Sequence, residues 1–172
     1  DAWVKLNFEF TRHRDSEVFV LVASDEVLET LEDQQMQLQS MASMGRFVEF
    51  FKSQVDKWQR TLGNVETVVK LLLGAQKCWS SLEAIFLASA DIRSSLPDDT
   101  KRFEEVDAGF KELMVNAKAR PQVVECCSTE GREETLLSMN KNLEMCQRAL
   151  NEYLDMKKNV FPRFYFVSNM AL

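Results

Sequence analysis

The apolar residues between Arg46 and Leu87 repeat at steps of three and four for longer than those of any other segment, a spacing that places them on one side of an α-helix. Up to Gly74 this stripe consists of Phe47, Phe51, Val55, Trp58, Leu62, Val65, Val69 and Leu72. Beyond that glycine it continues through Gln76, Trp79, Leu82 or Glu83, and Phe86. The pattern predicts one long helix, or two nearly collinear helices joined at Gly74. At about 1.5 Å per residue the helix would span roughly 60 Å, so other helices must lie along it.

Residues 3–22 show a different, alternating pattern. Leu6, Phe8 and Phe10 alternate with polar residues, and Val18, Val20 and Val22 repeat the alternation. A period of two is typical of half-buried strands, so we expect a β-hairpin with a loop of about four or five residues. Because an isolated two-stranded hairpin is marginally stable in water, it should rest on the helices or on parts of a parent protein.

Three further helices are predicted from their start and stop signals. Ser24, followed by two acidic residues, is a good cap for a helix that reaches about Met44. Pro97 opens another helix that should end near Ala119, and Gly131 precedes the last one. Their apolar faces are, in order, Val27 or Leu28, Leu31, Gln35, Leu38 and Met41; Phe103, Val106, Phe110 and Leu113; and Leu136, Met139, Leu143, Cys146, Leu150 and Tyr153.

These patterns predict a mainly α fold, an elongated helical bundle with a very long central helix and an N-terminal β-hairpin. We expect a single fragment in which residues 3–22 form the hairpin and residues 24–158 the bundle. Residues 160–167 should be extended, because proline forces the residue before it out of the helical region. Residues 168–172 have the sequence of a helix start that is cut short, which favours a piece of a larger chain.

Two groups of aromatic residues are candidate interaction sites. The first lies in the aromatic run near the C-terminal end, which would be an interaction surface if exposed. Its candidate residues are Phe161, Pro162, Arg163, Phe164 and Phe166. The second group is Trp58, Trp79 and Phe86, whose place on the long stripe favours packed core over an aromatic binding face.

Gly63 and Gly74 lie inside the predicted long helix, where glycine costs up to about 1 kcal/mol relative to alanine. One explanation is steric, a close crossing by another helix that leaves no room for a side chain. The other is mechanical, a candidate hinge, that is, a weak point at which the long helix bends. The steric explanation is favoured, because sharp bends usually also need a proline, a π-bulge or an inserted group.

Composition and motifs argue against several functions. With 21 basic against 27 acidic residues and no basic run, nucleic acid is not an expected partner, and no apolar stretch is long enough to suggest a membrane partner. The four cysteines and one histidine lack the spacing of a metal site. No phosphate-binding glycine loop occurs, and the acidic pairs fit capping or solvated positions. We therefore expect no catalytic, cofactor-binding or metal-binding residue and no cofactor.

Several segments carry a family resemblance. Residues 76–86, QKCWSSLEAIF, fit the pattern Q-x-x-W-x-x-L-E-x-I-F, and residues 90–92, 96–97 and 103–107 fit the stretch that follows it. Residues 150–158, leading into 161–168, fit a further distinctive pattern. Together they resemble the linker region of dynein heavy chains. Residues 31–39 and 161–168 are more similar to axonemal chains, of the outer-arm type, than to cytoplasmic ones.

The resemblance implies a non-catalytic, mechanical role. A dynein linker is a largely helical lever that lies across a ring of ATPase modules and changes its bend during the ATP cycle, for movement along microtubules. The implied partners are the remaining linker, the ATPase ring and other dynein subunits, and the implied location is cytoskeletal, in the axoneme of a cilium or flagellum. The alternative from the residue pattern is a helical scaffold or adaptor module of spectrin-like type. A small enzyme is a third hypothesis, which has no cluster of catalytic residues to support it.

Overall fold

The computed structural model describes residues 2–22 and 25–160. Its elements, in order, are α1 (Ala2–Lys5), β1 (Phe10–Arg12), β2 (Phe19–Leu21), α2 (Asp25–Ala42), two 3₁₀ turns η1 (Gly45–Phe47) and η2 (Glu49–Phe51), α3 (Lys52–Ala88), α4 (Ala90–Ser95), α5 (Pro97–Ala119), α6 (Val123–Cys127) and α7 (Arg132–Val160). The predicted fold class is confirmed: the chain is mainly helical, with a very long helix and an N-terminal hairpin.

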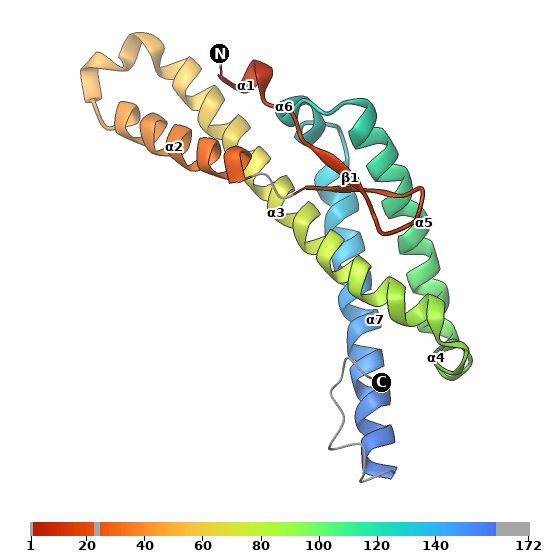
Figure 1. The fold of residues 1–172 in the computed structure, drawn as a ribbon. Coiled ribbons are helices and arrows are strands. Elements are labelled where there is room, and N and C mark those ends of the chain that lie inside the picture. Colours follow the sequence, from red (N-terminus) through yellow and green to blue (C-terminus); the bar gives the residue numbers. More distant parts are fainter. Residues whose placement is uncertain (1, 23–24, 161–172) are drawn as a thin grey trace.

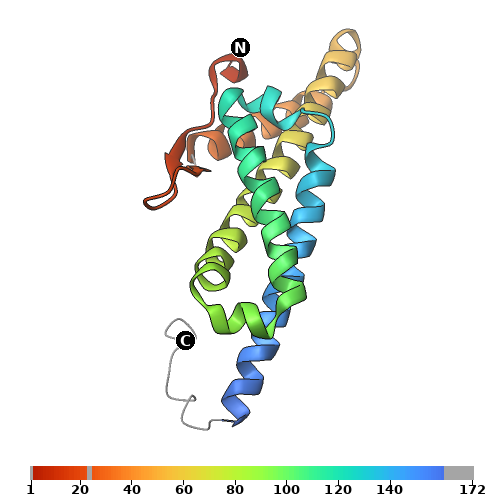
Figure 2. The ribbon, with the colours of Figure 1, turned by 90° about the vertical axis from the view of Figure 1, so that its right-hand side faces the viewer.

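The long helix α3 is the element on which the others pack. Helix α7 lies along its second half and also packs on α5, while α2 runs beside its first half. The α2–α3 pair projects at one end of the molecule, and α7 extends beyond the other helices at the opposite end (Figures 1 and 2). None of the described helices has the length and apolar character needed to cross a membrane.

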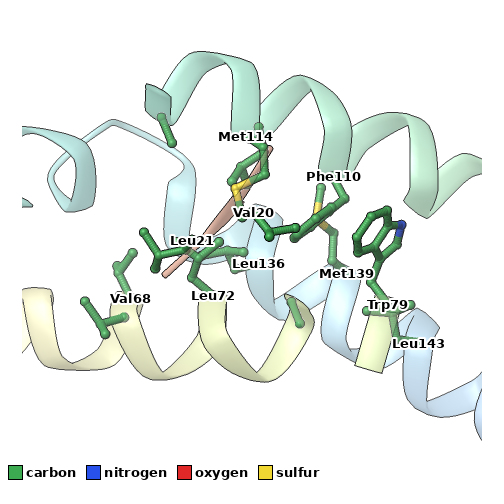
Figure 3. Packing of buried hydrophobic residues seen from close by; sticks show 14 of the residues in the cluster. Val20, Leu21, Val68, Leu72, Trp79, Phe110, Met114, Leu136, Met139 and Leu143 are labelled. Carbon is green, nitrogen blue, oxygen red and sulfur yellow. The ribbon is translucent and has the colours of Figure 1, made fainter. Parts of the chain in front are cut away.

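The core contains apolar side chains from all the long elements. Figure 3 shows Val20 and Leu21 of the hairpin lying between Leu72 of α3 and Met114 of α5, with Leu136 of α7 beside them. The faces predicted for α5 and α7 are buried throughout. Their 3.6-residue periodicity was thus sufficient to orient both helices.

The hairpin is shorter than the alternating pattern predicted. The start of the segment is the helical turn α1, because Trp3 is buried in the core and its carbonyl accepts a hydrogen bond from Gln122 Nε2 at 2.5 Å. Leu6 to Phe8 pair with the chain before α6, through an isolated bridge between Asn7 and Gln122. The β1–β2 ladder itself covers three residue pairs, with Thr11 opposite Val20.

The long helix also begins later than predicted. Residues 45–51 form two tight 3₁₀ turns after Gly45, whose φ of +59° reverses the chain between α2 and α3. From Lys52 onwards α3 is a single helix of 37 residues, without an interruption at Gly74. Two short helices that the pattern did not predict, α4 before Pro97 and α6 at residues 123–127, connect the longer ones. The predicted Ser24 cap, the aromatic run and the truncated helix from 168 lie outside the described residues.

Candidate functional site

The tip of the hairpin docks on α3 through a buried histidine. His13 is 8% exposed, and its Nε2 lies 2.7 Å from Oε2 of Glu83 on α3. Its ring also packs on the Trp79 indole, with centroids 4.8 Å apart. The loop holds this geometry, since the His13 carbonyl accepts a hydrogen bond from the Ser16 hydroxyl at 2.6 Å and Arg14 takes up a positive φ of 53°. Folding therefore carries the one histidine of the loop into the helical core.

The free edge of β2 is paired by a glutamine side chain. Gln76 of α3 accepts a hydrogen bond from the Leu21 backbone N–H and donates one to the Leu21 carbonyl, both at 2.7 Å. A primary amide offers the same donor and acceptor as a peptide group, so Gln76 replaces a missing strand partner. Because Leu21 is 4% exposed, both of its backbone groups would otherwise be buried without a partner.

Trp79 joins this region to α5. Its side chain is fully buried, its Nε1 donates to Asp107 at 2.9 Å, and its indole stacks on Phe110 at 4.6 Å. Lys111 forms an ion pair with the same aspartate at 2.6 Å. The buried indole N–H is thus satisfied, and α3 and α5 are fixed by a directional contact as well as by apolar packing.

Gln76, Trp79 and Glu83 occupy positions i, i+3 and i+7 of α3 and so lie along one side of the helix. We call these three residues, with His13 and Leu21, the hairpin-docking site. Its chemistry is that of a structural clamp, because each polar group has a partner within the site or on α5. A group of three side chains that would hold a metal ion is absent from the described residues.

The structure separates the aromatic candidates. Trp79 and Phe86 are fully buried, and Phe86 stacks on Phe103 at 5.3 Å. Trp58, by contrast, is 40% exposed, so the prediction that it is packed core is wrong for the part of the chain that the structure describes. The reason is that no described element covers the stripe at that point of α3. The C-terminal candidates Phe161, Pro162, Arg163, Phe164 and Phe166 lie outside the described residues.

The two candidate hinge glycines are not crossed by another backbone. A Cβ added at Gly63 would meet nothing within 4 Å, and one at Gly74 would meet the Asn140 side-chain oxygen at 3.7 Å. That distance is ordinary van der Waals contact, so the favoured steric explanation finds no support. Whether either glycine acts as a hinge stays a prediction.

Sequence reasoning missed the roles of His13, Gln76 and Glu83. It considered His13 as a possible metal ligand and treated Gln76 as a member of an apolar stripe. The polar residue on that stripe was the available signal, since a glutamine at a core-facing position needs a buried hydrogen-bond partner. The identity of the partner, 55 residues earlier in the chain, depends on the tertiary fold.

The cysteines are held as neutral thiols. Burial raises the pKa of Cys127 to about 12 and that of Cys146 to about 11, and burial also raises the pKa of Cys78 and Cys126. The Cys78 Sγ lies 3.4 Å from the side-chain oxygen of Gln147 on α7. Because the thiolate is the nucleophile, these shifts argue against a reactive cysteine.

Comparison with known proteins identifies the family. The family model described as "Dynein heavy chain, N-terminal region 2" matches residues 1–172. The chain belongs to the dynein heavy chain family. It is 44% identical over 171 residues to the dynein beta chain of the flagellar outer arm of Chlamydomonas reinhardtii, covering 98% of the chain. It is 41% identical to human dynein axonemal heavy chain 9, covering 99% of the chain.

The match covers a small part of each relative. The chain spans 4% of the length of the flagellar beta chain and 4% of the human axonemal chain. The dynein alpha chain of the flagellar outer arm, 36% identical, is matched over the whole of this chain and again over 4% of its own length. Membership of the dynein family favours the motor reading over a spectrin-like scaffold. The resemblance at residues 76–86 also gains a structural explanation, because these residues include the α3 part of the hairpin-docking site.

Proposed function

We propose that this chain is part of the linker of an axonemal dynein, a mechanical lever that transmits ATP-driven changes of the motor ring into movement along microtubules. It acts in the axoneme of a cilium or flagellum, as the names of its relatives suggest. It performs no chemistry and needs no cofactor of its own. Its partners are the remaining linker, the ATPase ring and other dynein subunits.

The observation that carries this proposal is the way α3 is held. A helix of 37 residues is about 55 Å long, and a single helix of that length bends under load. Here α7 supports its second half, and the hairpin-docking site fastens the hairpin across α3 and α5. Hydrogen bonds that join the hairpin, α3 and α5 keep these elements from sliding past one another and keep α3 from bending. A lever requires both.

The test weakens the clamp without touching the ring. Gln76→Ala in the intact heavy chain removes both partners of Leu21 at the edge of β2, whereas Lys77→Ala, at the neighbouring exposed position of the same helix, is the matched control. We expect Gln76→Ala to lower the distance that microtubules glide per ATP hydrolysed, with the ATPase rate of the ring preserved. The control should leave both quantities unchanged.

Two results would contradict the lever role. One is a gliding speed that falls only in proportion to the ATPase rate, because the coupling between chemistry and movement would then be intact. The other is unchanged coupling in a Gln76→Ala protein whose hairpin has been shown by hydrogen exchange to detach.

A further inference from the structure

Residues 36–61 form a projecting arm that buries very little. The arm consists of the second half of α2, the two 3₁₀ turns and the first turns of α3, and it stands apart from the three-helix core (Figures 1 and 2). Among its described large apolar side chains, Val55 is the one below 9% exposure. The arm's exposed large apolar side chains are Met36, Met41, Met44, Phe50, Phe51 and Trp58.

The exposed side chains continue the buried face of α3. Phe51, Trp58 and Leu62 follow one another at helical spacing on a single stripe. Leu62 is 1% exposed, whereas Trp58 is 40% and Phe51 53% exposed. The stripe is therefore apolar over its whole length, but before Leu62 the described residues cover it only in part: Val55 is 7% exposed, while Trp58 and Phe51 stay open. Asn64, whose side-chain amide donates to the Cys127 carbonyl at 3.1 Å, marks the place where α6 closes on α3.

Two helices side by side do not bury enough surface to hold such an arm in place. Ordering each residue costs on the order of 1–2 kcal/mol of backbone entropy, which burial of apolar surface must offset. On the arm this burial is largely missing. A depression of about 430 Å³ lies between the end of α2 and the start of α3, and it is lined by Ala42, Val48 and Val55 together with the charged side chains of Arg46, Glu49, Lys52 and Asp56. The exposed aromatic side chains of Phe50, Phe51 and Trp58, rather than this depression, form the apolar part of a candidate interaction surface.

The charges on the arm favour one kind of occupant. It carries four basic side chains, Arg46, Lys52, Lys57 and Arg60, against the two acidic ones, Glu49 and Asp56, in a chain of net charge −6. None of the four basic groups forms an ion pair within residues 2–22 and 25–160. A symmetric contact with a second copy would place the same basic patch against itself. A helix with an apolar stripe and acidic flanks fits instead.

We propose that the arm is a docking surface for an amphipathic, acid-flanked helix of the same heavy chain, from outside residues 1–172. The buried stripe of α3 continues directly into this surface, and 4% of the length of the flagellar beta chain corresponds to this chain, so ample heavy chain exists to supply the helix. A helix tethered to the same polypeptide also binds at high effective concentration. This inference rests on family membership and goes beyond the lever proposal.

A photocrosslinker placed on the arm tests this directly in the intact heavy chain. p-Benzoylphenylalanine replaces Phe50, which at 88% exposure is not needed for folding, or Trp58 in a second variant. Irradiation and peptide mass spectrometry should identify one helical, acidic segment of the same heavy chain. The matched control carries the photocrosslinker at Lys141, an exposed position on α7, and should not label that segment. Adding Phe51→Glu to the Phe50 variant should abolish the crosslink.

Every other outcome overturns the proposal. Crosslinks to a different polypeptide, to a second copy of the chain, to residues 1–172 themselves or to no peptide would each show that another partner, or none, covers the arm. A failed crosslink leaves the lever proposal standing, because that proposal is tested by the coupling of ATP hydrolysis to movement.

Discussion

Two parts of the same helix contrast in how they are buried. From Leu62 to Phe86, α3 hides its apolar stripe completely, and Trp79 and Phe86 have no exposed surface. From Lys52 to Thr61 the stripe has the same spacing and similar residues, yet it is only partly covered: Val55 is buried, whereas Trp58 is 40% exposed. We call Leu62–Phe86 the body of α3. The body and the arm therefore differ in the elements packed on them and hardly in their sequence pattern.

This difference shows what the helical periodicity of a sequence can predict. A stripe shows which face of a helix avoids water, but it does not show whether the covering element lies in the same chain. For the body, the covering elements are α2, α4, α5, α6, α7 and the hairpin. On the arm, the described residues cover Val55 but leave Phe51 and Trp58 exposed, and we propose that the remaining cover comes from elsewhere in the heavy chain.

The largest contrast between body and arm should appear in thiol reactivity. Since burial raises the pKa of Cys127 from 9.0 to about 12, its thiolate fraction at pH 8 is about 1000-fold below that of an ordinary thiol. Met44→Cys places a thiol on the arm, where Met44 is 55% exposed. We expect iodoacetamide to modify the arm thiol at least about 1000-fold faster than Cys127, as followed by mass spectrometry.

Similar rates at the two positions would show that the body opens readily, which contradicts a closed core. The same pKa shift has a consequence for stability. Because the unfolded chain releases the Cys127 proton first, the free energy of unfolding should fall as the pH rises from about 9 towards 12.

A pair of tryptophan substitutions compares the two parts in free energy. Trp79→Ala leaves a cavity between α3 and α5 and removes the indole hydrogen bond to Asp107, so it should lower the free energy of unfolding by about 3–5 kcal/mol. Trp58→Ala should cost less than about 1 kcal/mol in residues 1–172, as surface substitutions do. Urea unfolding measures both. Equal losses would mean that the arm is covered within this chain.

Substitutions of two glycines test a smaller change in the free energy of unfolding, at the junction of arm and body for Gly63 and within the body for Gly74. Gly63→Ala and Gly74→Ala each add a methyl group without a close contact, and each should stabilise the fragment by up to about 1 kcal/mol. If Gly74 is a hinge, the same substitution slows motility in the intact motor. A destabilisation above about 1 kcal/mol at Gly74 would instead identify it as a packing residue, through overpacking against Asn140.

Much of the fold could be predicted because its signals are local. The helix faces of α5 and α7, the proline at the start of α5 and the glycine before α7 each depend on residues within a few positions of one another. The first turns of α3 were predicted too early, because the stripe at Phe47 and Phe51 continues through residues that form 3₁₀ turns instead.

The hairpin-docking site was beyond the reach of local signals. His13 and Glu83 are 70 residues apart, and their pairing depends on where the hairpin rests. Likewise, the alternation at Leu6 and Phe8 indicated a strand but could not indicate that its partner is the chain near Gln122. The sequence pattern predicts which face of each element is apolar. Which element packs on that face depends on the folded bundle.

Hydrogen exchange along α3 tests most directly whether one apolar stripe is closed in the body and open on the arm. In residues 1–172 the amides of Lys52–Thr61 should exchange at least about tenfold faster than those of Leu62–Phe86, a difference of about 1.4 kcal/mol in opening free energy. In the intact heavy chain the arm amides should become as protected as the body. Uniform protection of α3 in the fragment, or an arm that stays open in the intact chain, would contradict the account.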